Sequence, residues 1–194
     1  MENVKTITKE NLTLTISYDD CAESSREWDN LGTMICEHNR YSLGDNHDLD
    51  FSECASWEDH EKVIKEEFGR DCIMLPLYLY DHSAITMNTT GFSCNWDSGR
   101  VGTIVVSRDK VRKEFNKKRV SPKLKNQILK ILESEVETYD QYLTGEVFSY
   151  SIENENGEVI DSCCGFYGED YAIQEGKSML EFYIKNQNQN QKAA

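Results

Sequence analysis

The amino-acid sequence predicts an α+β fold in which a mainly antiparallel sheet packs against two or three amphipathic helices. Apolar and polar residues alternate over 12–18, the period of a strand with one buried face. Over residues 122–143 the apolar positions recur at helical spacing instead. The turn sequence Asn156-Gly157 favours a hairpin, and no strand–helix–strand alternation suggests a parallel sheet.

The first part of the chain contains one clear strand and a long polar stretch. Residues 12–18 form the strand with which we expect the fold to open. Residues 19–54 show no sustained period and are rich in turn sequences such as DNLG, SLGD and DNHD. At most a helical turn or two is expected around residues 28–36, in a folded polar loop anchored by Trp28 and Leu31.

A helix and three strands are predicted next. Residues 57–68 form a helix, since a serine precedes them as a cap and their apolar side chains share one face. The apolar run 72–80 predicts a largely buried strand, in which Pro76 lacks an amide donor and favours an edge or a bulge. Segments 84–90 and 101–107 are further strand candidates, which completes a meander.

The second half contributes helices and a hairpin. A short basic helix is expected after Ser107, and strands flank the Asn156-Gly157 turn. A last amphipathic helix is predicted over residues 170–185, although Gly176 weakens its middle. The helix over 122–143 has the clearest apolar stripe, which consists of Leu124, Ile128, Ile131, Leu132, Val136 and Tyr139.

Length and composition predict one intracellular domain. A chain of this length buries a sizeable core without covalent links, so residues 1–185 are expected to form a single domain and 186–194 a flexible polar tail. The first residues lack the apolar stretch of a secretory signal, and no apolar run is long enough to span a bilayer. The seven cysteines lack CxxC spacing, which favours reduced thiols and therefore the cytoplasm of a host cell.

The formal net charge of −14 is unevenly distributed along the chain. Residues 1–70 carry 17 acidic and 7 basic side chains, residues 100–130 carry 2 and 11, and residues 131–194 carry 13 and 3. Two interpretations stay open. The fold neutralises the basic segment against its acidic neighbours, or the surface has an acidic face that docks on a basic partner and a basic face that contacts phosphate.

Acidic stretches that contain tryptophan and tyrosine are candidate docking surfaces. Aromatic side chains anchor a partner, whereas carboxylates steer the encounter and select a basic, nucleic-acid-binding surface. A solubilising surface is the alternative. The candidate partner-binding residues are Trp28, Asp29, Asp48, Asp50, Trp57, Glu58, Asp59, Glu135, Glu137, Tyr139, Asp140 and Tyr142.

The basic segment 100–130 suggests an alternative function, nucleic-acid binding. Its side chains neutralise several phosphates if they lie on one face, but the single interleaved aromatic residue, Phe115, does not favour base stacking. The rest of the chain, at −23, opposes the approach of DNA. The candidates are Arg100, Arg108, Lys110, Arg112, Lys113, Lys117, Lys118 and Arg119, followed by Lys123 and Lys125.

The polar loop offers a further alternative, a metal-dependent hydrolase centred on residues 36–48. Thiolate, imidazole and carboxylate groups are the ligands of zinc and manganese, and Cys36 beside His38 is also the only close pair of thiol and base. The spacing matches no known zinc pattern, so we expect no metal, no cofactor and no catalytic activity. The candidate ligands are Cys36, His38, Asp45, His47 and Asp48.

Three stretches resemble small proteins carried by phages and mobile elements of Gram-positive bacteria: REWDNLGTMICEHNRYSLGD, CIMLPLYLYDHSAITMNTTGF and VETYDQYLTGEVFSY. This group is identified with anti-CRISPR proteins that inhibit type II Cas9, and the resemblance covers most of residues 10–185. It implies a non-enzymatic inhibitor that binds a host nuclease such as Cas9, or its guide RNA and DNA complex. It assigns no role to any individual residue.

Overall fold

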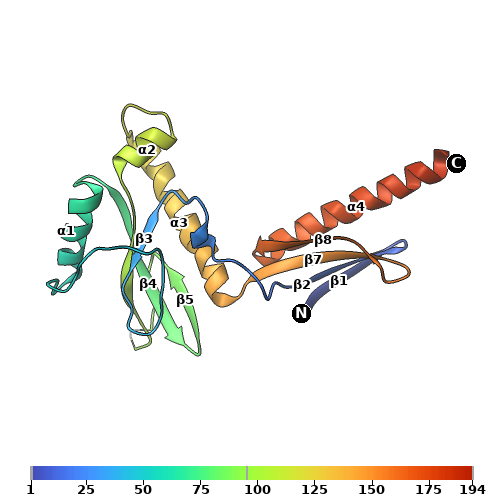
Figure 1. Ribbon diagram of the computed structural model, residues 1–194, viewed down its shortest axis with the longest axis horizontal. Coiled ribbons are helices and arrows are strands. Elements are labelled where there is room, and N and C mark those ends of the chain that lie inside the picture. Colours follow the sequence, from blue (N-terminus) through green and yellow to red (C-terminus); the bar gives the residue numbers. More distant parts are fainter. Residues whose placement is uncertain (1, 95, 194) are drawn as a thin grey trace. The chain divides into compact units, whose positions relative to one another are not determined.

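The computed structural model describes residues 2–94 and 96–193, with the backbone alone for residues 190–193, and divides the chain into two compact units (Figure 1). The central unit is Ser25–Asp140, and the terminal unit combines residues 1–24 with residues 141–194. Each unit contains one four-stranded antiparallel sheet, which confirms the α+β class. The division into two units was not foreseen from the sequence, in which we found no interior linker. Every helix of the described residues is too short or too polar to cross a membrane.

The sheet of the central unit has its most buried strand inside. From edge to edge the strands are β3 (Thr33–Cys36), β6 (Ser98–Val106), β4 (Ile73–His82) and β5 (Ala84–Asn88). The last six residues of β6 are all buried, because helices cover both faces of the sheet. A continuous run of buried residues is what a strand covered on both faces requires.

Two helices cover opposite faces of this sheet (Figure 1). On one face, Ile64 of α1 (Trp57–Phe68) packs against Ile35 of β3 and Val105 of β6. On the other face, a Cβ at Gly32 would lie 2.6 Å from Leu132 of α3 (Pro122–Thr144) and 2.7 Å from Ile104. Between them in sequence lies α2 (Arg108–Glu114), and the predicted serine caps are present on α1 and α2.

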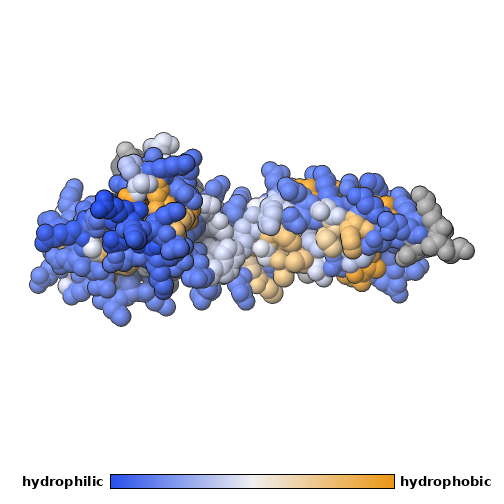
Figure 2. Space-filling model, turned by 90° about the horizontal axis from the view of Figure 1, so that it is seen from above, coloured by the Kyte–Doolittle hydropathy of each residue, from blue (hydrophilic) through white to orange (hydrophobic). Residues whose placement is uncertain are grey.

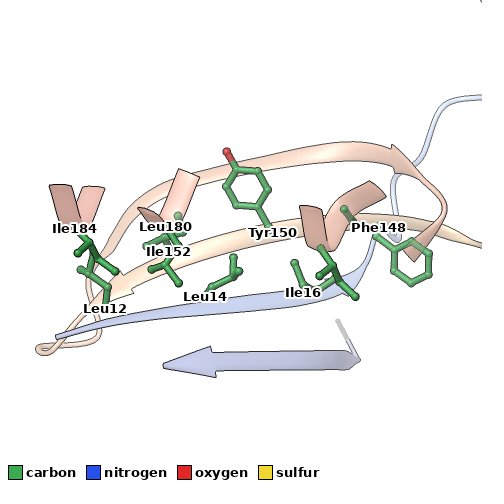
Figure 3. Packing of buried hydrophobic residues seen from close by; sticks show 10 residues of the cluster. Leu12, Leu14, Ile16, Phe148, Tyr150, Ile152, Leu180 and Ile184 are labelled. Carbon is green, nitrogen blue, oxygen red and sulfur yellow. The ribbon is translucent and has the colours of Figure 1, made fainter. Parts of the chain in front are cut away.

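The terminal unit is a sheet with one helix on one face (Figure 3). The strands follow the order β1 (Asn3–Lys9), β2 (Leu12–Tyr18), β7 (Val147–Asn154) and β8 (Val159–Tyr167), and α4 (Glu169–Ala193) covers them. A Cβ at Gly176 would lie 2.9 Å from Leu14, so the glycine allows α4 to approach the sheet closely. The core of this unit consists of Leu12, Leu14, Ile16, Phe148, Tyr150, Ile152, Ala172, Ile173, Leu180 and Ile184.

The structure differs from the sequence-based expectations in several elements. The opening strand β1 was not predicted, because its polar residues form a strand only by pairing with β2. At most a helical turn or two was expected around residues 28–36; a 3-10 turn lies just before, at Ser25–Glu27, and strand β3, which was not predicted, occupies the end of this stretch and pairs with β6. Pro76 lies in an inner strand, with the irregularity one residue further on, between Leu77 and Tyr78. The last helix continues to Ala193, beyond the expected end.

Candidate interaction surfaces

A buried ion-pair network fixes the segment that carries Trp28. The guanidinium of Arg26, whose side chain is 4% exposed, donates to both oxygens of Asp45 at 2.8 and 2.6 Å. It also lies 3.4 Å from Glu135 on α3. Burial disfavours the charged form, but hydrogen bonds and charges from Asp45 and Glu135 outweigh it and raise the pKa of Arg26. The network therefore joins three segments that are distant in sequence.

Three predicted partner-binding residues act inside the fold. The carboxylate of Glu135 accepts hydrogen bonds from the backbone amides of Leu31 at 2.7 Å and Gly32 at 3.0 Å. The buried Tyr139 accepts from the backbone amide of Gly44 at 3.0 Å through its hydroxyl oxygen. The carboxylate of Asp140 accepts from the backbone amide of Met87 and from the hydroxyl of Thr86, at 2.6 and 2.8 Å. Their polar groups hold loops and strands against α3, so we leave them out of the docking surface.

Trp28 lies beside two hollows on the α3 side of the central sheet. It is 49% exposed, so about half of its side chain faces solvent. The first hollow measures about 220 Å³ and is lined by Trp28, Asn30, Ile131 and residues of α3. The second, about 270 Å³, shares Asn30 and Ile131 with the first and extends to Phe115. We call the rim and floor of these hollows the Trp28 surface.

The backbone beneath the Trp28 surface is tied down. The side-chain amide of Asn30 donates to the carbonyl oxygens of Ser25 at 2.8 Å and Trp28 at 3.0 Å. The carbonyl of Asn30 in turn accepts from Lys110 Nζ at 2.7 Å. The sequence predicted Trp28 as a partner-binding residue. It did not single out Ile131, which belongs to the apolar stripe of α3 and was therefore expected to face the core. The structure leaves Ile131 half-buried, where it lines both hollows.

The remaining acidic candidates separate into two groups on opposite faces of the central sheet. Glu58 lies on α1, and Asp48 and Asp50 flank Leu49, which packs in the same cluster as Ile64 of α1. Glu137 lies on α3, and Asp29 lines the second hollow together with Ile131 of α3. All five are exposed. None of these five carboxylates forms an ion pair with a described residue. Two further candidates, Trp57 and Asp59, contact neighbouring side chains. The ring of Trp57 stacks under Arg100, with 4.7 Å from the guanidinium carbon to the ring centre, and Asp59 pairs with Lys62 within α1. The last candidate, Tyr142, belongs to the terminal unit.

The basic segment is only partly neutralised by the fold. Arg100 pairs with Glu61 at 3.1 Å and Arg108 with Asp71 at 3.1 Å. Arg112 pairs with Asp109, and Lys110 caps the carbonyl of Asn30. The other side chains are exposed, and none of them forms an ion pair within the described residues. Lys130 lies further along α3, and the other six, which we call the basic corner, are Lys113, Lys117, Lys118, Arg119, Lys123 and Lys125.

The candidate metal ligands are engaged in other contacts. The carboxylate of Asp45 accepts hydrogen bonds from the guanidinium of Arg26 and, at 2.8 Å, from the backbone amide of Met34. The ring of His38 stacks on Tyr41 with 5.0 Å between centres, and His47 lies 3.5 Å from the carbonyl of Cys36. Together these segments line an open hollow of about 440 Å³. Across the described residues, no three His, Cys, Asp or Glu side chains are grouped to hold a metal ion.

Cys36 is not arranged as a nucleophile. Burial, and to a lesser extent the charge of Asp45, raise its pKa to about 12 against a smaller opposing effect of Arg26. A thiol needs a lowered pKa to attack at neutral pH, so Cys36 stays protonated and inert there. These contacts give the hydrolase hypothesis no support.

We expect Cys36 to resist alkylation in the folded protein. Treatment with iodoacetamide at pH 8 should label the exposed Cys21, Cys163 and Cys164 first, because thiolate formation and access control the rate. Peptide mapping by mass spectrometry at successive times measures this order, and unfolding in urea should make Cys36 react like the others. Labelling of Cys36 as fast as Cys164 would contradict a partly buried thiol with a raised pKa.

Comparison with protein-family models, curated proteins and solved structures found no match. Functional conclusions therefore rest on the geometry of the chain itself.

Proposed function

We propose that this chain is a phage- or mobile-element-encoded inhibitor of a host defence nuclease and acts by stoichiometric binding. The observation that carries the proposal is the Trp28 surface, where a half-exposed tryptophan stands beside two hollows. A large aromatic side chain next to pockets that accept partner side chains is typical of the energetic centre of protein–protein interfaces. The partner is accordingly a folded protein surface.

The rim of the Trp28 surface favours a basic partner. Asp29 and Glu114 lie at the second hollow, and Glu137 is exposed on the same helix that lines the first. Carboxylates around an aromatic anchor raise the association rate with cationic surfaces and disfavour acidic ones. Nucleases that grip DNA or RNA present such cationic surfaces, so a bound acidic protein competes with nucleic acid for them.

Preorganisation adds to the affinity of this surface. The network of Arg26, Asp45 and Glu135 and the amide contacts of Asn30 already order the backbone on both sides of Trp28. Binding then costs less conformational entropy than docking through a loop that must first become ordered. At low ionic strength, where screening is weak, the terminal unit also attracts cationic partners, since it carries 14 acidic and 5 basic residues, a net charge of −9.

A cleavage assay tests the proposal. Increasing amounts of the purified chain are added to Cas9 with its guide RNA, and separately to restriction endonucleases, and DNA cleavage is measured. Inhibition should saturate at a fixed molar ratio, because the mechanism is binding rather than turnover. Trp28→Ala should raise the half-inhibitory concentration at least about tenfold, as truncation of a central aromatic anchor does.

The matched control is Trp96→Ala. Trp96 is 96% exposed in the same unit and lines neither hollow of the Trp28 surface, so its removal should leave inhibition unchanged. Undiminished cleavage by every nuclease at large molar excess would reject the inhibitor function. Equal inhibition by the wild type and the Trp28→Ala variant would instead reject the Trp28 surface as its site.

A further inference from the structure

We infer that the basic corner of the central unit binds the phosphate backbone of a nucleic acid. The corner comprises the end of α2, the connection to α3 and the first turn of α3. The corner adjoins the second hollow of the Trp28 surface, which Glu114 and Phe115 line, but none of its cations lines either hollow. The inference does not depend on inhibition of a nuclease. Its cationic residues are Lys113, Lys117, Lys118, Arg119, Lys123 and Lys125.

The fold gathers these cations at one tight corner. The backbone amide of Lys117 donates to the carbonyl of Arg112 at 2.9 Å, and Asn116 adopts a positive φ of 49°, so the chain turns immediately after α2. Ser121 then caps α3 by accepting from the amide of Leu124 at 3.2 Å. A turn followed by a capped helix holds the connecting residues in a compact arrangement, rather than spreading them along an extended linker.

Buried apolar residues orient the corner. Val111 of α2 is fully buried, and Leu124 of α3 is 8% exposed, so both helices turn their apolar sides inward. The intervening lysines and the arginine are therefore directed to solvent. Figure 2, viewed from the side on which α2 lies, shows hydrophilic residues covering most of this end of the central unit beside a small apolar patch.

The distribution of ion pairs divides the basic segment into two parts with different roles. Arg100 and Arg108 in its first part pair with acids of the fold, Glu61 and Asp71. Between Lys113 and Lys125 the only acid is Glu114, which is exposed. Six cations beside one carboxylate leave a local net charge of +5, which an evenly neutralised surface would not carry. The first part stabilises the fold, and the second remains for an anionic ligand.

A phosphate backbone fits this corner better than a protein partner. Five of the six cations are lysines, which act as mobile point charges, and the only aromatic residue between them, Phe115, is half-buried. Protein interfaces are depleted in lysine and need apolar anchors, whereas sequence-independent binding to phosphates needs positive charge alone. The acidic net charge of the whole chain does not forbid this contact, because salt screens charges beyond about 10 Å at 0.1 M.

Fluorescence anisotropy with a labelled 20-base-pair DNA duplex, without any nuclease present, tests the inference. At 50 mM salt the full-length chain should bind, and log Kobs should fall linearly with log salt as counterions are released. The triple variant Lys117→Ala, Lys118→Ala, Arg119→Ala should bind at least about tenfold more weakly, with a salt slope shallower by about 2 to 3.

The control variant removes the same charge elsewhere. Lys5→Ala, Lys9→Ala, Lys177→Ala alters three exposed lysines of the terminal unit and should change affinity by less than about twofold, with circular dichroism confirming that both variants fold. Equal loss in both variants would mean that overall charge, not the corner, controls binding. No binding at 50 mM salt, or tighter binding to polyglutamate than to the duplex, would also overturn the inference. Because no nuclease is present, failure here leaves the inhibitor proposal unaffected.

Discussion

Replacing Arg26 by methionine is expected to destabilise the central unit by about 3–5 kcal/mol. The guanidinium is almost fully buried and is shared by Asp45 and Glu135. Methionine fills a similar volume but leaves two largely buried carboxylates, 21% and 13% exposed, near each other without a cation. Desolvated like charges without compensation are far more costly than the loss of an exposed ion pair.

Urea denaturation followed by tryptophan fluorescence measures this effect. Arg112→Met is the control, because Arg112 pairs with Asp109 at the surface and its loss should change the free energy of unfolding by less than about 0.5 kcal/mol. If the Arg26→Met variant were as stable as the Arg112→Met variant, the network around Arg26 would not hold the central unit together.

Gly102→Ala is expected to have an effect of similar size through a different cause. Gly102 lies in β6 and is paired with Cys36 of β3. A Cβ at Gly102 would lie 2.2 Å from the carbonyl oxygen of Ile35 and 2.9 Å from the Cα of Cys36. Both are backbone atoms, so no side-chain rotation relieves the clash and β3 must move away from β6. We expect the variant to lose more than about 3 kcal/mol of stability, at or above the upper end of overpacking effects.

Gly99→Ala tests the same substitution in the same strand. No atom lies within 4 Å of a Cβ built at Gly99, and its backbone does not require glycine. The melting temperature of Gly99→Ala should therefore stay close to that of the wild type, while Gly102→Ala melts at a much lower temperature or fails to fold. A Gly102→Ala variant as stable as Gly99→Ala would contradict the close approach of β3 and β6.

Local sequence patterns predicted most helices and strands but missed those that depend on distant partners. The serine that precedes residues 57–68 and the apolar stripe of 122–143 act within a few residues of themselves, so α1 and α3 could be predicted. The short strand β3 could not, because residues 33–36 become a strand only by pairing with β6, about seventy residues later. The division into two units could not be predicted either, since no local pattern indicates that residues 1–24 fold with residues 141–194 rather than with the central unit.

The sequence by itself determined the class of the fold, the helix caps and the separation of acidic and basic segments along the chain. Only the tertiary structure decided which of those charges remain available for a partner. Glu135 and Glu137 are two residues apart and look equivalent in sequence, yet Glu135 lies beside Arg26, 109 positions away, and Glu137 faces solvent. The physical reason is that desolvation and pairing act on neighbours in space, and those neighbours come from segments that no local pattern connects.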